Sequence, residues 1–247
     1  MKRQLGTQVG MALFIWVSAS ALAQAQQQYG DPTNFPGTYL TQRSSPPTPP
    51  GLVPRIDVTY FVDGTFSATE HALINQAASV WSSTTASVRL VEVFALAGAN
   101  IDLTSVNLNN NTTNLADRVI TSTPGAGTYP DGTPWRTITG ASIEIDRNLP
   151  AITPFYYLNG ITSLQPNEYD YFSVILRELG LGLGLGFAPG DPGSVMDSNI
   201  TTGESHRTLS PNDIAALQTL YGTPEPATWA LFGIGLLTLG AMRRFRA

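Results

Sequence analysis

The sequence predicts an α/β domain over residues 55–222, and three observations favour that class. Residues 56–62 are mostly β-branched or aromatic with rough alternation, which is typical of a strand. Apolar residues then recur at the three- and four-residue spacing of a helix. A second helix with clear start and stop signals closes the region. Strands and helices are therefore expected within one domain.

The first helix is expected to begin after Ser67, because Ser67 and Glu70 have the spacing of a capping box. One face of this helix carries Leu73, Ile74, Ala77, Ala78 and Trp81, which we expect to be buried. Further strands are expected at residues 88–95, 101–106, 118–121 and 141–145. The Asn-rich run 107–114 and the Gly- and Pro-rich run 123–134 are expected to be loops.

Residues 170–185 are expected to form a central helix. Gly180 and Gly182 each weaken such a helix by about 1 kcal/mol relative to alanine, so tertiary packing must hold it. The alternative is that the alternating Leu-Gly run forms a loop or a strand. The core stripe of the helix would be Phe172, Ile175, Leu176, Leu179 and Leu183.

The last helix has clear boundaries. Ser210 can cap its start, Pro211 suits its first position, and Asp213 favours its positive end. Gly222 ends it. Its buried face would consist of Ile214, Leu217, Leu220 and Tyr221.

The stretch 177–187 has the frame of a zinc-protease helix without the metal ligands. In the pattern H-E-x-x-H-x-x-G-x-x-H, three histidines hold zinc and the glutamate activates a water. Glu178 and Gly184 stand at the matching offsets, and the histidine positions are occupied by Arg177, Leu181 and Phe187. Leucine and phenylalanine have no lone pair for a metal, and arginine stays protonated. The spacing thus indicates a protease shape and argues against protease chemistry.

Five segments, in order, resemble the catalytic domain of matrixin-type metzincins: residues 77–81, 141–146, 174–187, 194–196 and 209–222. The resemblance implies a twisted, mostly parallel sheet with a central motif helix, a Met-turn and a C-terminal helix. It implies that Met196 lies beneath the metal position and that residues 141–146 form the substrate-side edge of the sheet. Only Glu178 carries over as a catalytic group, a relic general base that lacks a metal-activated water.

Zinc is predicted to be absent, although the family resemblance implies it. His71 and His206 are the only histidines. The alternative is a rebuilt site in which His206 approaches the cleft together with Glu204 or Asp197. Structural calcium held by Asp and Asn side chains of loops is compatible with the composition, but no segment has EF-hand spacing.

Arg177 is the subject of a sharper hypothesis. Loss of a divalent cation leaves a carboxylate in a partly buried cleft, which needs a partner. The Arg177 guanidinium would then take the former metal volume and neutralise Glu178 or Asp170. Adjacent helix residues do not face each other, so contact with Glu178 requires the arginine side chain to curl. The alternative is that Arg177 points into solvent.

The first 54 residues are predicted to lie outside the folded domain. Residues 1–25 have a basic start, an apolar run and A-x-A cleavage sequences, which are typical of a secretory signal peptide. Residues 26–54 are rich in Pro, Ser and Gln and are predicted to be a linker.

Residues 223–247 combine the motif Pro224-Glu225-Pro226, a short apolar run and a basic end. This tail resembles the PEP-CTERM sorting signal of Gram-negative bacteria. The resemblance implies processing by an exosortase, after signal peptidase has acted at the other end, and a destination at the cell surface or in the extracellular polymer matrix. The apolar run would anchor the chain transiently in the inner membrane, with its basic end in the cytoplasm.

The mature chain is acidic. Five of the 13 basic residues and one of the 18 acids lie in the two signals, which leaves eight arginines, 17 acids and a net charge of about −9. This balance disfavours nucleic acid and anionic membranes as partners, so the tail is the expected membrane contact. The chain has no Cys, which excludes disulfides and thiolate nucleophiles.

These observations predict an exported matrixin-like domain that has lost zinc-protease activity, a pseudopeptidase. Its old cleft, made more apolar by Leu181 and Phe187, would bind peptide or polymer. One alternative is a zinc-dependent metalloendopeptidase with a rearranged metal site. The other is a structural protein of the extracellular polymer matrix, for which the fold is a scaffold.

Overall fold

The structure is a computed structural model that describes residues 39–41, 55–85, 87–106, 115–128, 134–146, 155–156 and 164–222. The predicted signal peptide, the Asn-rich loop and the sorting tail lie outside these residues. No helix among the described residues is long and apolar enough to cross a membrane.

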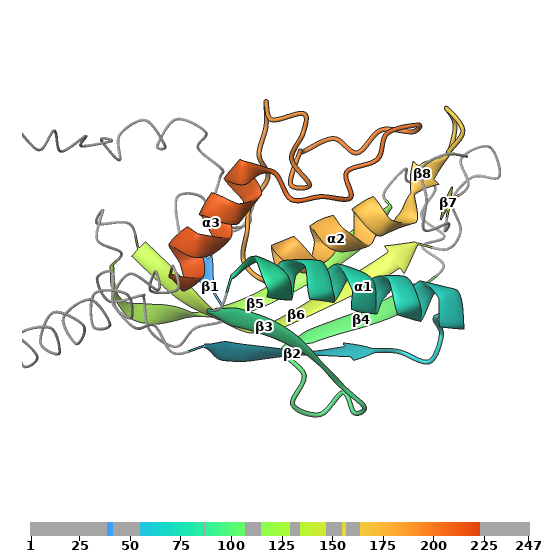
Figure 1. Ribbon diagram of the computed structural model, residues 1–247. Helices are drawn as coiled ribbons and strands as arrows, with labels where there is room; N and C mark the ends of the chain where they lie inside the picture. The colour runs from blue at the N-terminus through green and yellow to red at the C-terminus, as the bar shows by residue number, and fades with distance from the viewer. Residues whose placement is uncertain are drawn as a thin grey trace, which may run out of the picture.

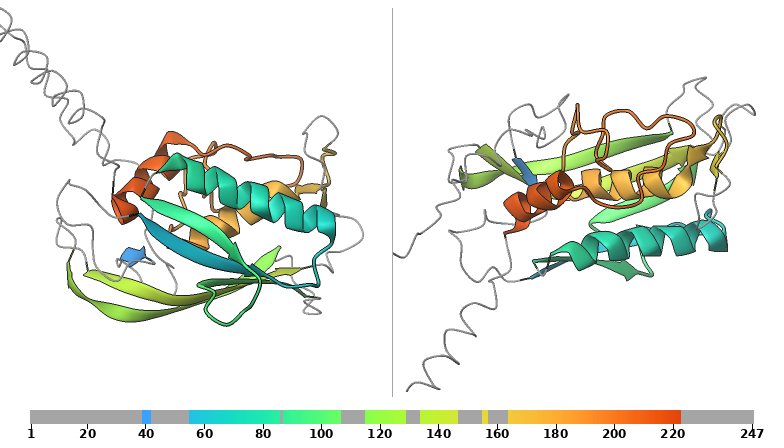
Figure 2. Two further views of the ribbon diagram at one scale, coloured as in Figure 1. Left: turned by 60° about the horizontal axis from the view of Figure 1, so that its bottom comes forward. Right: turned by 45° about the horizontal axis from the view of Figure 1, so that its top comes forward.

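Six strands form one sheet, in the order β1-β6-β4-β2-β3 with β5 on the other side of β6 (Figures 1 and 2). Every pairing is parallel except that of β5 with β6. This arrangement confirms the predicted mostly parallel α/β class. The strands are β1 (Tyr39–Thr41), β2 (Ile56–Val62), β3 (Val88–Val93), β4 (Ile101–Val106), β5 (Ala116–Thr128) and β6 (Pro134–Asp146).

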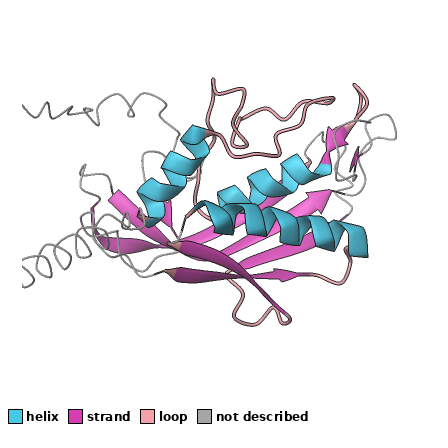
Figure 3. Cartoon of the chain, viewed as in Figure 1, coloured by secondary structure: helices cyan, strands magenta, loops and turns pink. Residues whose placement is uncertain are grey.

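Three helices pack over one face of this sheet: α1 (Ala68–Thr84), α2 (Tyr171–Gly182) and α3 (Pro211–Tyr221). Figure 3 shows them as a layer above the strands, with the long connection from α2 to α3 passing over the top. Two very short strands, β7 (Phe155–Tyr156) and β8 (Tyr169–Asp170), pair with each other, and β8 leads directly into the N-terminus of α2. The strand β1 belongs to the segment predicted as a linker, and it lies beside the first half of β6.

The local signals for α1 and α3 are confirmed. Ser67 and Glu70 form the capping box of α1, and Ser210 and Asp213 form that of α3. The predicted apolar face of α1 is buried throughout. In α3, Ile214 is only partly buried and Ala216 lies in the core instead.

Two predictions about the sheet were wrong, and both concern β5. The run 123–134 was expected to be a loop, yet β5 continues to Thr128 by antiparallel pairing with β6. Residues 141–146 were expected to form the substrate-side edge, yet β6 has β4 on one side and β5 on the other. The long hairpin pairing supplies backbone hydrogen bonds that override the weak strand propensity of Gly and Pro. An edge strand also tolerates Pro124, because its missing N–H need not face a partner.

The central helix α2 is buried on nearly all sides, so packing decides its sequence more than helix propensity does. A side chain on Gly180 would place its Cβ 2.7 Å from Met196 Sδ and 2.7 Å from Trp81 Cζ2. A side chain on Gly182 would meet Ile101 Cδ1 at 3.0 Å. Trp81 also donates from Nε1 to the carbonyl of Leu176 at 2.7 Å. The Leu-Gly run is therefore a helix that neighbours approach closely, and the loop and strand alternatives are wrong.

Hydrogen bonds from α3 hold residues 183–195, the segment that follows α2. Asp213, fully buried, accepts hydrogen bonds from Ser194 Oγ at 2.5 Å and from the amide of Val195 at 3.0 Å. Tyr221 donates from Oη to the carbonyl of Leu183 at 2.6 Å. These hydrogen bonds fix the turn that carries Met196 against α3.

We predict that Gly180→Ala lowers the free energy of unfolding by roughly 1–2 kcal/mol, because overpacking against Met196 and Trp81 outweighs the gain in helix propensity. Urea denaturation measures the change. Gly64→Ala is the matched control, since a Cβ there meets nothing within 4 Å. A Gly180→Ala protein as stable as the native chain would contradict this packing account.

Candidate functional site

The residues of the degenerate motif meet at the second half of α2. The Arg177 Nε lies 3.4 Å from Oε1 of Glu178, the next residue of the helix. The Arg177 side chain is 12% exposed and that of Glu178 only 2%. Arg177 therefore forms an ion pair with Glu178, one of the two carboxylates that the hypothesis named, and it does not extend into solvent. Asp170 pairs with Arg207 instead.

A second arginine, Arg118 on β5, reaches the same carboxylate. Its Nη1 lies 3.9 Å from Oε2 of Glu178, and its side chain is 19% exposed. Sequence reasoning did not find this residue as part of the site. Arg118 and Glu178 stand 60 positions apart, and only the pairing of β5 with β6 brings them together.

Phe187 follows the turn that ends α2 and lies beside the two arginines. Gly184 adopts φ +94°, a conformation that favours glycine, and its amide donates to the carbonyl of Leu181 at 2.9 Å. The chain then returns so that Phe187 lies beside two guanidinium groups. The Cζ atoms of Arg118 and Arg177 lie 5.1 Å and 5.9 Å from the ring centroid, within the range of cation–π attraction.

Leu181 and Met196 lie in the core. Leu181 is 2% exposed and belongs to the main hydrophobic cluster. Leu181 therefore does not line an open cleft as expected, because neighbouring core residues cover it. Met196 is fully buried against the position of Gly180, and its carbonyl accepts from the amide of Ala188. The Met-turn thus packs beneath the helix.

The charges of this cluster are unbalanced. Two guanidinium groups surround one carboxylate, and the contacts at 3.4 and 3.9 Å are long for charge-assisted hydrogen bonds. Glu178 Oε2 and Arg118 Nε are buried without a hydrogen-bond partner. We call Arg118, Arg177, Glu178 and Phe187 the arginine cluster.

The described residues do not fit a catalytic zinc. Of the four motif positions, only Glu178 offers oxygen lone pairs, and both of its oxygens face guanidinium groups. Within the described part of the chain, no group of three or more His, Cys, Asp or Glu residues could hold a metal ion.

The comparison with known families adds to this geometry. A family model described as Matrixin matches residues 55–222, well over half of the chain. The chain belongs to the matrixin family. A second model, described as the PEP-CTERM protein-sorting motif, matches residues 223–244. No curated protein matches the chain.

Both resemblances seen in the sequence are thereby confirmed, and the sorting motif marks this matrixin as a protein destined for export. The motif residues Pro224, Glu225 and Pro226 lie outside the described residues. Within the matrixin domain, β6 is an interior strand and the antiparallel edge strand is β5.

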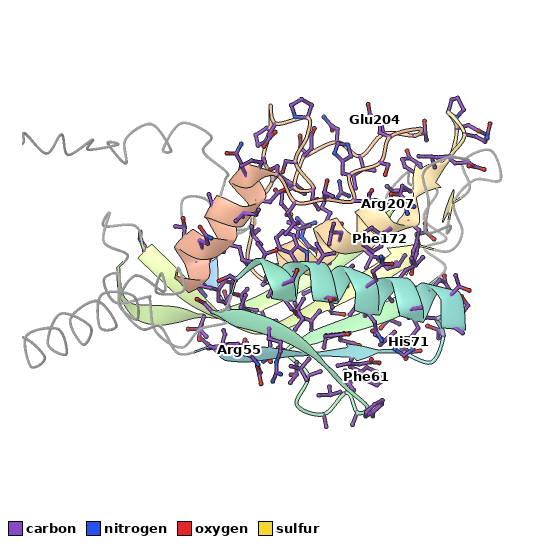
Figure 4. All side chains as sticks on the ribbon, viewed as in Figure 1. Arg55, Phe61, His71, Phe172, Glu204 and Arg207 are labelled. Carbon is purple, nitrogen blue, oxygen red and sulfur yellow. The ribbon has the colours of Figure 1, made fainter. Side chains whose placement is uncertain are left out.

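His206 does not join the arginine cluster. It belongs to the loop between α2 and α3, between Glu204 and Arg207, which Figure 4 labels. Its Nε2 is 3.9 Å from Glu204 Oε2, and its backbone amide donates to Ser173 Oγ at 2.7 Å. Asp197 accepts hydrogen bonds from Ser198 and Asn199, its neighbours in sequence. The described contacts therefore do not assemble the alternative metal site.

Ser173, Asp170 and His206 lie close together but do not form a catalytic triad. Ser173 Oγ donates to Asp170 Oδ2 at 2.6 Å, and the His206 contact to Ser173 comes from the backbone and not from the imidazole. Asp170, fully buried, also receives both Nε and Nη2 of Arg207 at 2.7 and 2.5 Å. This set fastens the loop to the start of α2 and supplies no activated nucleophile.

His71 belongs to a separate polar group beneath α1. His71 Nε2 lies 2.5 Å from Glu92 Oε1, and Asn75 donates to Glu92 Oε2 at 2.9 Å. The Tyr60 hydroxyl donates to Asn75 Oδ1 at 2.9 Å. Burial, with a smaller contribution from the Glu92 charge, raises the pKa of Tyr60 to about 12. His71 thus serves a hydrogen-bonded structural group.

We predict that the raised Tyr60 pKa makes stability depend on pH in the alkaline range. The unfolded chain loses the phenolic proton near pH 10 while the folded chain keeps it to about pH 12. The contribution to stability is therefore complete below pH 10 and is lost as the pH rises towards 12. Urea midpoints of the native chain should fall more steeply over this window than those of Tyr60→Phe. Parallel profiles would contradict the shift.

We also predict that Arg177→Ala lowers the free energy of unfolding by about 1–3 kcal/mol, because it leaves buried Glu178 with only the distant Arg118. Arg89→Ala is the control. Arg89 pairs with Asp57 where both side chains are more than 40% exposed, and such pairs contribute little. Equal stability of the Arg177→Ala and native proteins would argue against any pairing role.

Proposed function

We propose that this exported matrixin is a pseudopeptidase, a domain that keeps the protease scaffold and binds peptide without cleaving it. The observation that carries the proposal is the environment of Glu178. A general base must offer a lone pair to a water, whereas both Glu178 oxygens face arginines. A bound zinc would supply water activation, but Arg177, Leu181 and Phe187 cannot ligate it.

Peptide binding is supported by the edge strand. Among the described strands, β5 pairs only with β6, so its outer row of N–H and C=O groups is available to an added strand. Its side chains alternate cleanly: Arg118 and Ile120 are half-buried towards the helices, and Asp117, Val119 and Thr121 are exposed. Such an edge offers an extended peptide main-chain hydrogen bonds.

The sorting tail supports the rest of the proposal. A signal peptidase and an exosortase would process the chain, and the mature domain would reside at the cell surface or in the extracellular polymer, with the tail as a transient inner-membrane anchor. Structural calcium in the loops is compatible with this location and is not needed for the proposed function.

We predict that the whole chain, expressed with its export signals and purified in mild detergent, carries no stoichiometric zinc and does not cleave casein. Elemental analysis and a cleavage assay with and without chelator measure this. Stoichiometric zinc together with chelator-sensitive cleavage would establish the rearranged metalloendopeptidase and overturn the proposal. Binding of extracted exopolysaccharide without peptide binding would favour the structural matrix role.

A matched variant tests whether the residues at the three motif histidine positions alone account for the proposed loss of zinc binding. Arg177→His, Leu181→His and Phe187→His together restore the ligand types of the motif. If the scaffold is retained, this triple variant should bind about one zinc per chain where the native chain binds none. Zinc in neither protein would show that the ligand residues are not the whole cause.

A further inference from the structure

The arginine cluster holds more positive charge than its surroundings neutralise. The mature chain has only eight arginines and 17 acidic residues, yet two of the arginines contact the single carboxylate of Glu178. Arg55 and Arg89 also share one partner, Asp57, but their side chains are 49% and 44% exposed, so water compensates them. Arg118 and Arg177 are 19% and 12% exposed and have much less access to water.

The contacts within the cluster leave hydrogen-bond donors unused. Arg207 holds Asp170 with two short bonds, at 2.7 and 2.5 Å. Arg118 and Arg177 instead approach Glu178 at 3.9 and 3.4 Å, and Arg118 Nε is buried without a partner. A guanidinium carries five N–H donors in a planar fork that matches a carboxylate. Arg118 and Arg177 can therefore donate hydrogen bonds to a second carboxylate.

The cluster is also open on the side of the edge strand. The helix-facing residues of β6, which include Ile143 and Ile145, are buried. On β5 the residues of the same face, which include Arg118 and Ile120, remain partly exposed. The helix layer thus covers β6 but leaves β5 incompletely covered, and a strand added to β5 would pass beside Arg118.

We propose that Arg118 and Arg177 together bind a carboxylate of an extended peptide that lies along β5. The ligand supplies the negative charge that the cluster lacks, and Phe187 holds the two guanidinium planes in position by cation–π contact. The carboxylate is either the C-terminus of the peptide or an acidic side chain. This inference rests on the proposed peptide-binding function and specifies what the site recognises.

Three synthetic probes test the inference on the whole chain by isothermal titration. They are acetyl-tetra-alanine with a free C-terminal carboxylate, the same peptide as its amide, and an amidated acetyl peptide with one internal glutamate. The peptide with a free C-terminal carboxylate, or the glutamate peptide, should bind at least about 10-fold more tightly than the neutral amide. Charge-assisted hydrogen bonds account for a difference of this size. The acid that binds more tightly identifies the source of the carboxylate.

Variants locate the effect. Arg118→Gln should remove the preference for a carboxylate, and Arg118→Lys, which keeps the charge but loses the fork, should weaken it. Arg89→Gln, on the exposed Asp57 pair, should leave it unchanged. If Arg118→Gln fails to fold, the Nε–H NMR signals of Arg118 and Arg177 in the native chain should shift with the acidic probes and not with the amide.

The outcomes separate this inference from the function on which it rests. Equal binding of all three probes, or a preference that survives Arg118→Gln, overturns the carboxylate site while leaving a zinc-free peptide binder intact. Tighter binding of an oligouronate than of any acidic peptide overturns the choice of a peptide ligand. Stoichiometric zinc in the same sample overturns the proposed function itself.

Discussion

A carboxylate that is 2% exposed must have a counter-charge, and much of the site's structure can be traced to that requirement at Glu178. In the metzincin pattern a divalent metal lies beside the motif glutamate. Here the charge comes from Arg177, the next residue of the helix, and from Arg118, across the sheet edge. One divalent ion and two guanidinium groups carry the same formal charge, but guanidinium groups donate hydrogen bonds and accept none. An arginine pair in the place of the ion would therefore conserve the charge without supplying Lewis acidity.

Packing and hydrogen bonds between protein groups hold the scaffold around Glu178. Gly180 lets Trp81 and Met196 approach α2 closely, and buried Asp213 fixes the turn that carries Met196. Leu181 stands at a former ligand position and adds apolar area to the core. Full burial of a leucine side chain contributes roughly 1.5–3 kcal/mol relative to leaving it exposed, so Leu181 supports the fold at this position without any metal contact.

Features set by local chemistry were predictable from the sequence. The capping boxes at Ser67 and Ser210 and the apolar face of α1 follow from spacing alone, and the structure places them as expected. The extent of β5 was not predictable, because pairing with β6 decides it against the preferences of its Gly and Pro residues. Arg118 was missed for the same reason, since its role depends on a contact 60 residues away. The burial of Leu181 was missed because helical spacing gives the side of the helix but not how completely other segments cover each position on that side.

The central claim is that guanidinium groups stand where the family pattern places a metal ion. Anomalous diffraction at the zinc absorption edge, from crystals of the native chain soaked in zinc, tests it most directly. The account predicts no anomalous peak within coordination distance of Glu178, and density for Arg118 and Arg177 beside its carboxylate. A peak about 2 Å from a Glu178 oxygen, with further nitrogen or oxygen ligands around it, would contradict the account.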